Sequence, residues 1–241
     1  MNDVQIRNTY PFSTHTDHEH DHGEDAHVPA PSAEDEADTM YWDRRTEALV
    51  RLLVGKGHFT RDDVRRQVET IEARTPMLGA RVVARAWTDP AFKARLLADA
   101  KAACAELGID TEPLAHITVL ENTADVHYAI VCTLCSCYPR QLLGDPPGWY
   151  KSTAYRNRMV VAPRQLLKES FGTNVADAVD LRVVDSTADS RFLVLPRRPA
   201  GTEGWSEVEL IRLVTRDSMV GVAQPLKPAD LAQCPGFLSH R

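Results

Sequence analysis

The stretch VCTLCSCYPR, from Val131 to Arg140, holds three of the five cysteines of the chain within six residues. These are Cys132, Cys135 and Cys137, in a C-x-x-C-x-C spacing. An odd number of cysteines, three of them crowded together, indicates a metal-binding or catalytic cluster and not a disulfide framework. This stretch is therefore the first candidate for a functional site.

Composition sets limits on the class of protein. The chain has 241 residues, of which 43% are hydrophobic and 26% charged, as is typical of globular proteins. Ten acidic residues and one basic residue lie in the first 40, whereas the remainder holds 27 basic and 24 acidic residues. The body shows no basic stripe, so we expect no nucleic-acid partner. No secretory signal or membrane-spanning segment is visible, which predicts a cytoplasmic protein in which disulfides are rare.

The predicted organisation is a tail, a helical arm, a metal-binding domain and a second tail. Residues 1–39 alternate histidine with acids and are predicted to be disordered, as a solubilising tail in preference to a metal store. Residues 40–110 are predicted as a helical arm, 111–225 as the metal-binding catalytic domain and 226–241 as a C-terminal tail. Cys234 lies in that last tail and is assigned no role.

Periodicity and capping residues predict an α/β fold, with helices first and a mixed layered domain afterwards. Thr60 and Asp63 resemble a capping box, and Asp89 with Pro90 opens a helix expected to run to Gly108. Cys104 in that helix is expected to be a packed core thiol. After residue 115 the pattern predicts strands in 116–122, 127–132 and 179–196, with helices over 163–172 and 205–216.

The cysteine spacing allows two kinds of metal site. Structural zinc and iron–sulfur clusters need four ligands, so His116, His127, Cys104 or Cys234 would have to complete the set. Alternatively, the sulfur and backbone nitrogen of Cys137 close a five-membered chelate ring, and the Cys135 sulfur with the Ser136 nitrogen closes a six-membered ring. The Cys132 sulfur then supplies an axial ligand, which leaves one octahedral position open. Thiolates and deprotonated amides suit a trivalent, low-spin ion.

The stretch resembles the metal-claw motif of the nitrile hydratase α subunit. The resemblance extends to ENTADVHYAIVCTLCSCYP, PPGWYKSTAYRNRMVVAPRQLLKESFG and DSTADSRFLVLPRRPAGTEGWSEVELIRLVTRDSMVGV, and it covers roughly residues 41–224. A related branch, the γ subunit of thiocyanate hydrolase, shares the claw.

The resemblance implies an α/β chain whose helical arm embraces a β-type partner subunit, with the active site at their interface. Carried over to this sequence, the metal ligands are Cys132, Cys135, Ser136 and Cys137, with Ser136 and Cys137 using backbone nitrogens. Cys135 and Cys137 are also the implied catalytic residues, oxidised to sulfinic and sulfenic acid respectively. Thr133 implies cobalt(III) in preference to iron(III), and a metallochaperone is expected to insert it. The implied reaction is hydration of a nitrile to an amide.

Two departures from the family concern the substrate. Arg140 stands where most nitrile hydratases have tryptophan, which would favour an anion such as thiocyanate; alternatively, Arg140 points away and pairs with a carboxylate. A family glutamine has no clear counterpart in GIDTEPLAHITV. Thiocyanate hydrolysis to carbonyl sulfide and ammonia therefore remains the alternative function, and a non-catalytic metal carrier is a third. Asp185 and Asp189 are interpreted as turn residues, with an outer hydrogen-bond shell as the other option.

Overall fold

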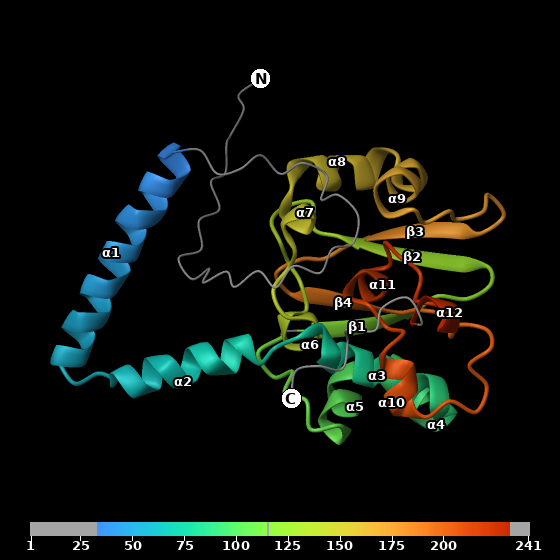
Figure 1. Cartoon of the computed structure of the whole chain (residues 1–241), viewed down its shortest axis with the longest axis horizontal. Coiled ribbons are helices and arrows are strands. Elements are labelled where there is room, and N and C mark those ends of the chain that lie inside the picture. The colour runs from blue at the N-terminus through green and yellow to red at the C-terminus, as the bar shows by residue number, and fades with distance from the viewer. Residues whose placement is uncertain (1–32, 115, 232–241) are drawn as a thin grey trace. The chain divides into compact units, whose positions relative to one another are not determined.

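The computed structural model describes residues 33–114 and 116–231, with side chains described from residue 40 onward (Figure 1). The predictions for the histidines of residues 1–32 and for Cys234 lie outside the described residues. The chain divides into two compact units, residues 1–70 and 71–241. The predicted functional boundaries at residues 110 and 225 stay predictions.

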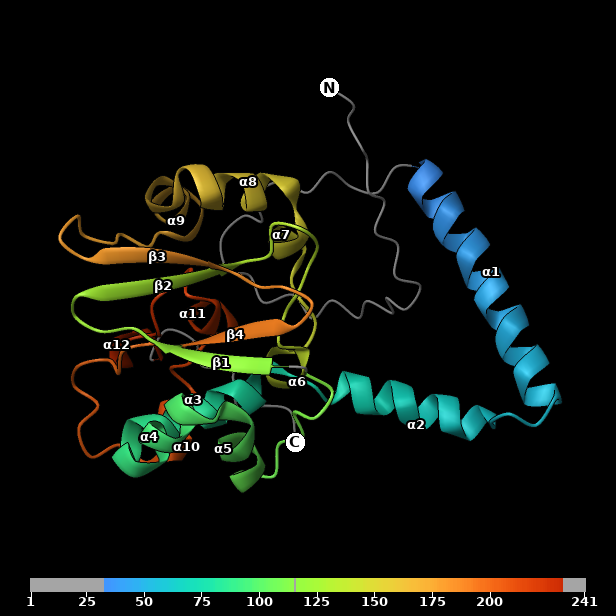
Figure 2. The ribbon, with the colours of Figure 1, turned by 180° about the vertical axis from the view of Figure 1, so that it is seen from behind.

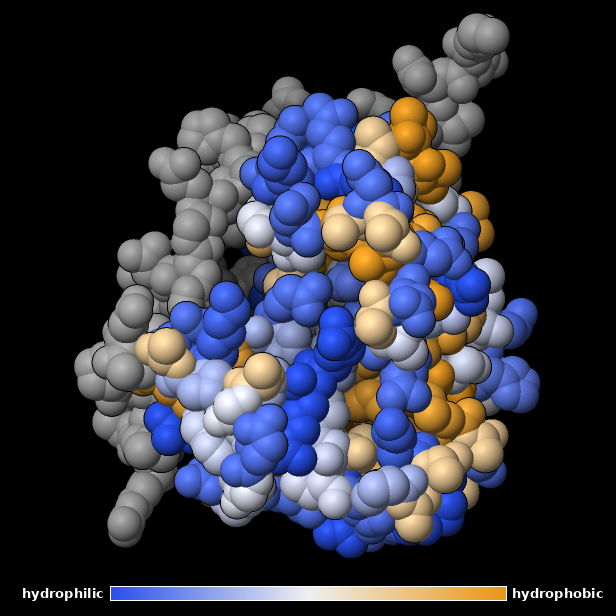
Figure 3. Space-filling view, turned by 90° about the vertical axis from the view of Figure 1, so that its right-hand side faces the viewer, coloured by the Kyte–Doolittle hydropathy of each residue, from blue (hydrophilic) through white to orange (hydrophobic). Residues whose placement is uncertain are grey.

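No helix of the described part is long and apolar enough to cross a membrane. On the face drawn in Figure 3, hydrophilic and apolar side chains are interspersed.

The first unit contains α1 (Ala33–Gly55) and most of α2 (Arg61–Glu72). None of its described side chains is buried, so these helices have no core of their own. Thr60 and Asp63 form the predicted capping box, because each backbone amide donates to the other side chain, at 2.7 and 3.1 Å. α1 begins at Ala33, inside the stretch that was predicted to be disordered. Helices stabilised mainly by capping and surface pairs depend on a packing partner for most of their stability.

The second unit begins with three helices, α3 (Pro76–Thr88), α4 (Pro90–Ala98) and α5 (Ala100–Glu106). The prediction of one helix from Pro90 to Gly108 was wrong, because the helix breaks at Asp99. Asp99 has extended dihedral angles and its carboxylate accepts a hydrogen bond from the Ala102 amide, so it ends α4 and caps α5. The side chain of Cys104 is fully buried in α5, as predicted.

Four strands form two parallel pairs. β1 (His116–Glu121) pairs with β4 (Ser190–Leu195), and β2 (Val126–Val131) pairs with β3 (Asp180–Asp185). Both views of the ribbon show the strands in the order β3, β2, β4, β1 (Figures 1 and 2). β1 is therefore not a hydrogen-bonded partner of β2, nor β3 of β4, and each parallel pair is joined through a long connection.

The remaining helices of this unit are short. They are α6 (Arg140–Leu143), α7 (Gly148–Lys151), α8 (Thr153–Val161), α9 (Pro163–Phe171), α10 (Glu207–Ile211), α11 (Arg216–Val220) and α12 (Pro228–Leu231). α9 ends at Gly172, as predicted, and Ser206 caps α10, which stops well before the predicted end at residue 216. α8 and α9 lie beside β3, and α3, α4, α5 and α10 lie on the side of β1 (Figure 1).

The carboxyl ends of the two strand pairs lie at opposite edges of the strand layer. β1 and β2 run in opposite directions, because only residues 122–125 separate them. A cleft of about 350 Å³ lies at the carboxyl ends of β1 and β4, lined in part by Trp87, Lys93, Glu121 and Arg197. The carboxyl ends of β2 and β3 lie at the opposite edge, where the cysteines follow β2.

Gly221 ends α11 with a φ of 83°, and its carbonyl oxygen accepts a hydrogen bond from the His127 ring at 2.8 Å. A Cβ atom at this position would lie 2.0 Å from the carbonyl oxygen of Tyr128. Gly172 has a φ of 63° but no atom within 4 Å of such a Cβ, so it is the matched control.

We expect Gly172→Ala to lower the free energy of unfolding by about 1–2 kcal/mol, the cost of left-handed backbone for alanine. Gly221→Ala should lower it by a further ~1–3 kcal/mol, because it also overpacks the strand. Urea denaturation of both variants measures the difference. Equal losses would contradict the close packing of α11 against β2.

Candidate metal centre

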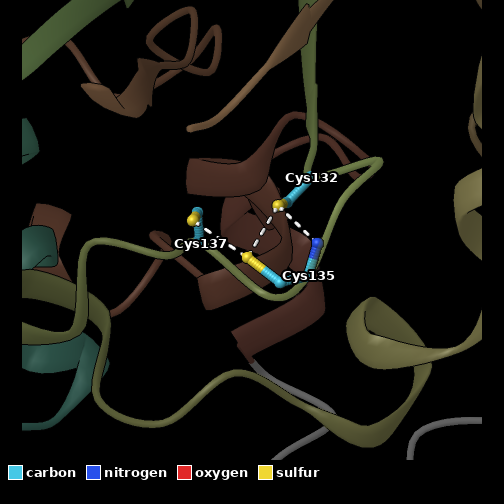
Figure 4. Close-up of side chains that lie close together, drawn as sticks. All are labelled: Cys132, Cys135 and Cys137. Atoms are coloured by element: carbon cyan, nitrogen blue, oxygen red, sulfur yellow. Dashed lines mark hydrogen bonds between the residues drawn. The ribbon is translucent and has the colours of Figure 1, made fainter. Parts of the chain in front are cut away.

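The cysteine loop, residues 132–137, brings three sulfur atoms together beyond the end of β2 (Figure 4). The Sγ of Cys135 lies 3.6 Å from that of Cys132 and 3.2 Å from that of Cys137. All three sulfurs lie within 4.8 Å of one another. These separations exceed the roughly 2.05 Å of a disulfide, so the three residues are free thiols converging on one point.

The loop is closed on one side and open on the other. Cys132 follows the last residue of β2 and is fully buried, and Cys137 is 8% exposed. Cys135 and Ser136 are half-buried. The strand end therefore fixes the first thiol in the core, whereas the middle of the loop is accessible to a ligand.

The backbone of the loop directs its N–H groups at sulfur. The Cys135 amide donates to the Sγ of Cys132 at 3.2 Å, and the amides of Ser136 and Cys137 lie close enough to stabilise charge on the Cys135 sulfur. In the described part of the chain, neither of these last two amides donates to a backbone carbonyl. The two nitrogens that the chelate hypothesis requires are therefore not used in backbone hydrogen bonds of this part of the chain.

The thiols of Cys135 and Cys137 differ in their tendency to ionise. Burial raises the pKa of the Cys135 thiol, but hydrogen bonds from both neighbouring thiols and from the next two backbone amides outweigh it, so that the net pKa is lowered. Burial, followed by the contact with Cys135, raises the pKa of Cys137 to about 12. A negative charge is thus favoured on Cys135 over Cys137, and ionisation of Cys137 would be assisted by a bound cation.

Asp185 fixes the first half of the loop. Its carboxylate accepts hydrogen bonds from the Thr133 amide at 2.9 Å and from the Thr133 hydroxyl at 2.5 Å. Asp185 is the last residue of β3 and pairs in register with Val131, so the parallel pairing of β2 with β3 brings it to the loop. Of the two interpretations of Asp185, the preferred one as a turn residue was wrong, and the contacts agree with the other, an outer hydrogen-bond shell, since its side chain holds the cysteine loop.

The second half of the loop is held by side chains that the sequence analysis did not identify. The Tyr150 hydroxyl donates to the carbonyl oxygen of Cys137 at 2.9 Å, and Arg156 of α8 donates to that of Leu134 at 3.5 Å. The Leu134 side chain is itself 78% exposed. No local pattern in the sequence links residues 150 and 156 to the cysteines.

The fourth ligand that a zinc or iron–sulfur site needs is not found in the described residues. No histidine, cysteine or carboxylate among them joins the three cysteines in one group. His127 is buried and its ring nitrogens contact the carbonyl of Gly221 and the side chain of Asn122, while Cys104 lies within α5. A donor set of three sulfurs and two nearby amide nitrogens therefore fits a trivalent ion better than tetrahedral zinc.

Arg140 begins α6, three residues after the last cysteine. One of its guanidinium nitrogens lies 3.3 Å from the carboxylate of Asp145, and the two side chains are 40% and 67% exposed. This is the pairing with a carboxylate of the same chain that was considered as the alternative. A role in a substrate pocket stays a prediction.

Asp185→Ala should lower the free energy of unfolding by about 1–3 kcal/mol, because it leaves the Thr133 amide and hydroxyl without their acceptor. Asp180→Ala is the control at the other end of β3, where the carboxylate pairs with Arg182 and both side chains are more than half exposed. That change should alter the free energy by less than about 0.5 kcal/mol. Denaturation curves that give both variants the same loss would show that Asp185 does not hold the loop.

Comparison with known proteins gives the same family throughout. The nitrile hydratase alpha chain family matches residues 40–223. The cobalt-containing nitrile hydratase subunit alpha of Pseudonocardia thermophila is 52% identical over 184 residues, which are 76% of this chain and 90% of that protein. The thiocyanate hydrolase subunit gamma of Thiobacillus thioparus is 39% identical over 208 residues, covering 82% of this chain and 84% of that protein.

Solved structures agree with the sequence comparisons. A double mutant of the Fe-type nitrile hydratase from Comamonas testosteroni Ni1 superimposes with a TM-score of 0.71 at 41% identity. The match covers 78% of this chain and 92% of that chain. The chain therefore belongs to the nitrile hydratase α-chain family.

Proposed function

We propose that this chain is the metal-carrying α subunit of a cobalt nitrile hydratase, which adds water to a nitrile to give the amide. The observation that carries the proposal is the convergence of three free sulfurs, those of Cys132, Cys135 and Cys137, within 4.8 Å of one another in the cysteine loop. Its presence in a chain 52% identical to a cobalt-containing nitrile hydratase subunit supports the choice of reaction.

The residues proposed to hold cobalt(III) are Cys132, Cys135 and Cys137 through sulfur, and Ser136 and Cys137 through their backbone nitrogens. An ion held there would supply Lewis acidity, polarising the nitrile or lowering the pKa of a water molecule. Within the chain, Cys137 oxidised to the sulfenic level would present an oxygen that acts as nucleophile or as base. Cys135, the more accessible thiol with the lowered pKa, is the one proposed to reach the sulfinic level.

Cobalt is preferred to iron on the basis of sequence and not of fold. A structure titled as an Fe-type enzyme shares the fold at a TM-score of 0.71, so the fold is compatible with either metal. Thr133 and the identity to cobalt-containing relatives favour cobalt. The Thr133 hydroxyl is engaged by Asp185, which gives that residue a defined place beside the ligands.

A β-type partner subunit is part of the proposal. α1 exposes five large apolar side chains: Met40, Tyr41, Trp42, Leu49 and Leu52. A helix with such a surface, in a unit whose described side chains include no buried one, is suited to packing against another chain. The active form is therefore proposed to be a cytoplasmic heteromer, with cobalt inserted by a metallochaperone.

Thiocyanate hydrolysis is the second candidate. Arg140 beside the cysteine loop and the 39% identity to a thiocyanate hydrolase γ subunit support it. The nitrile is preferred because identity to the nitrile hydratase subunits is higher and because Asp145 offsets the charge of Arg140.

The assembled protein, expressed with its natural partner and cobalt, should convert acrylonitrile to acrylamide and leave thiocyanate unchanged. Product analysis by chromatography for the amide and by ammonia release for thiocyanate separates the two reactions. Protein prepared without cobalt serves as the control. Ammonia and carbonyl sulfide from thiocyanate, with no amide from acrylonitrile, would reverse the assignment.

Mass spectrometry of the cobalt-loaded protein should find two oxygens on Cys135 and one on Cys137, as the thiol oxidation ladder allows. Cys132 and Cys104 are internal controls and should remain unoxidised. Cys104 is fully buried, and burial raises the pKa of its thiol to about 12, which suppresses thiolate chemistry. Unmodified Cys135 and Cys137 in active protein would contradict the proposed oxidation states.

A further inference from the structure

Tyr150 is the largest of the fully buried side chains in the described part of the chain. Its phenol hydroxyl donates a hydrogen bond of 2.9 Å to the carbonyl oxygen of Cys137. A buried hydroxyl requires a partner, and Tyr150 uses its only donor on the last residue of the cysteine loop. The contact therefore links the aromatic core directly to the backbone of that loop.

The position of this hydroxyl is fixed by the surrounding structure. Pro147 precedes α7 with a restricted φ of −64°, and the Tyr150 amide donates to the Pro147 carbonyl at 3.1 Å. The Tyr150 ring packs on those of Tyr138, Tyr155 and Trp149, with centroid distances of 5.0, 5.7 and 5.8 Å. Because other aromatic rings enclose the Tyr150 ring on several sides, its hydroxyl is held in a fixed position as the donor to the Cys137 carbonyl.

We propose that Tyr150 is a positioning residue of the metal centre, which sets the orientation of the Cys137 ligand atoms through the hydrogen bond to the Cys137 carbonyl. The proposal rests on the proposed function, because it takes Cys137 to bind the metal.

The covalent geometry of Cys137 explains the effect. The backbone nitrogen, the carbonyl carbon and the Cβ atom that carries the sulfur are all bonded to the Cα atom of Cys137. The peptide unit that carries the carbonyl is planar, so fixing its oxygen restricts ψ of Cys137. With that rotation restricted, the backbone nitrogen and Cβ of Cys137 keep one orientation relative to the anchored carbonyl, and the sulfur can then move only by rotation about χ1. This partial pre-organisation is what outer-shell partners of a ligand achieve.

Tyr155 provides a matched control. It is 4% exposed, belongs to the same aromatic cluster, and its hydroxyl donates to the carbonyl of Ile130 at 2.6 Å. Ile130 lies within β2 and outside the cysteine loop. Tyr155→Phe and Tyr150→Phe thus remove the same atom from equally buried sites, and they differ in whether the lost bond holds the loop.

The experiment compares both variants with the unaltered full-length chain, each expressed with the natural partner and cobalt. The readouts are cobalt per chain, the sulfur-to-cobalt charge-transfer absorption, the melting temperature, and kcat and KM for acrylonitrile. Both variants should melt at lower temperature. Y150F alone should change the absorption and lower metal content or kcat by roughly 10- to 100-fold, the effect of losing an outer-shell partner. KM should change little, because the bond does not contact substrate.

The proposal is overturned if Y150F and Y155F give the same absorption and the same kcat at equal cobalt content. If Y150F does not assemble, 3-fluorotyrosine at position 150 or 155 replaces it, since this analogue keeps the hydroxyl and makes it a stronger donor. The absorption should then shift for position 150 only, and equal spectra overturn the proposal. If the unaltered protein holds cobalt with this absorption but hydrates no nitrile, the proposed function is refuted. The role of Tyr150 is then decided by comparing the absorption of Y150F with that of Y155F. An assembly that takes up no cobalt refutes both.

Discussion

Three thiols held within 4.8 Å of one another, two of them buried, form a cluster that the protein must stabilise from outside. The pKa of Cys135 is lowered, whereas burial raises that of Cys137. Without its own helix or strand, a six-residue loop has little to fix it against the loss of conformational entropy. The loop is kept in one conformation by hydrogen bonds to the strands and helices around it.

Two restraints act on opposite ends of the loop and come from different parts of the fold. Asp185 reaches Thr133 because β3 lies parallel to β2, so that both strands end at the same edge. Tyr150 reaches Cys137 because α7, which follows the loop after α6, places the Tyr150 ring in the aromatic cluster. Neither restraint contacts a sulfur atom. Both act on the backbone and so leave the sulfur atoms available as ligands.

Local patterns identified some of these features and not others. Thiol convergence follows from the spacing of Cys132, Cys135 and Cys137, and the capping of α2 from the identity of Thr60 and Asp63. The break at Asp99 was missed because the apolar periodicity continues across it, while its side chain competes for the backbone locally.

Local sequence patterns did not predict the contacts by which Asp185 and Tyr150 hold the loop. Asp185 is 52 residues from Thr133. Their contact depends on the parallel pairing of β2 with β3, which cannot be predicted from turn residues as a hairpin can. Tyr150 is close in sequence, but its hydrogen bond depends on how α7 packs. Long-range pairing and helix packing are tertiary properties, so hydrophobic periodicity and turn residues carry little information about them.

The two proposed reactions share the cysteine loop, so the preference between a nitrile and thiocyanate is argued from groups around it. An unpaired guanidinium at Arg140 would attract an anion, whereas one that lies 3.3 Å from the Asp145 carboxylate forms a pair with little net charge. The Coulomb attraction that such a pair exerts on thiocyanate falls off faster with distance than that of a single charge, and solvent screens it further at this exposure. A neutral nitrile carries no net charge, so its binding depends little on whether Arg140 is paired with Asp145. The ion pair with Asp145 therefore removes much of the advantage that the sequence at position 140 would give to an anionic substrate.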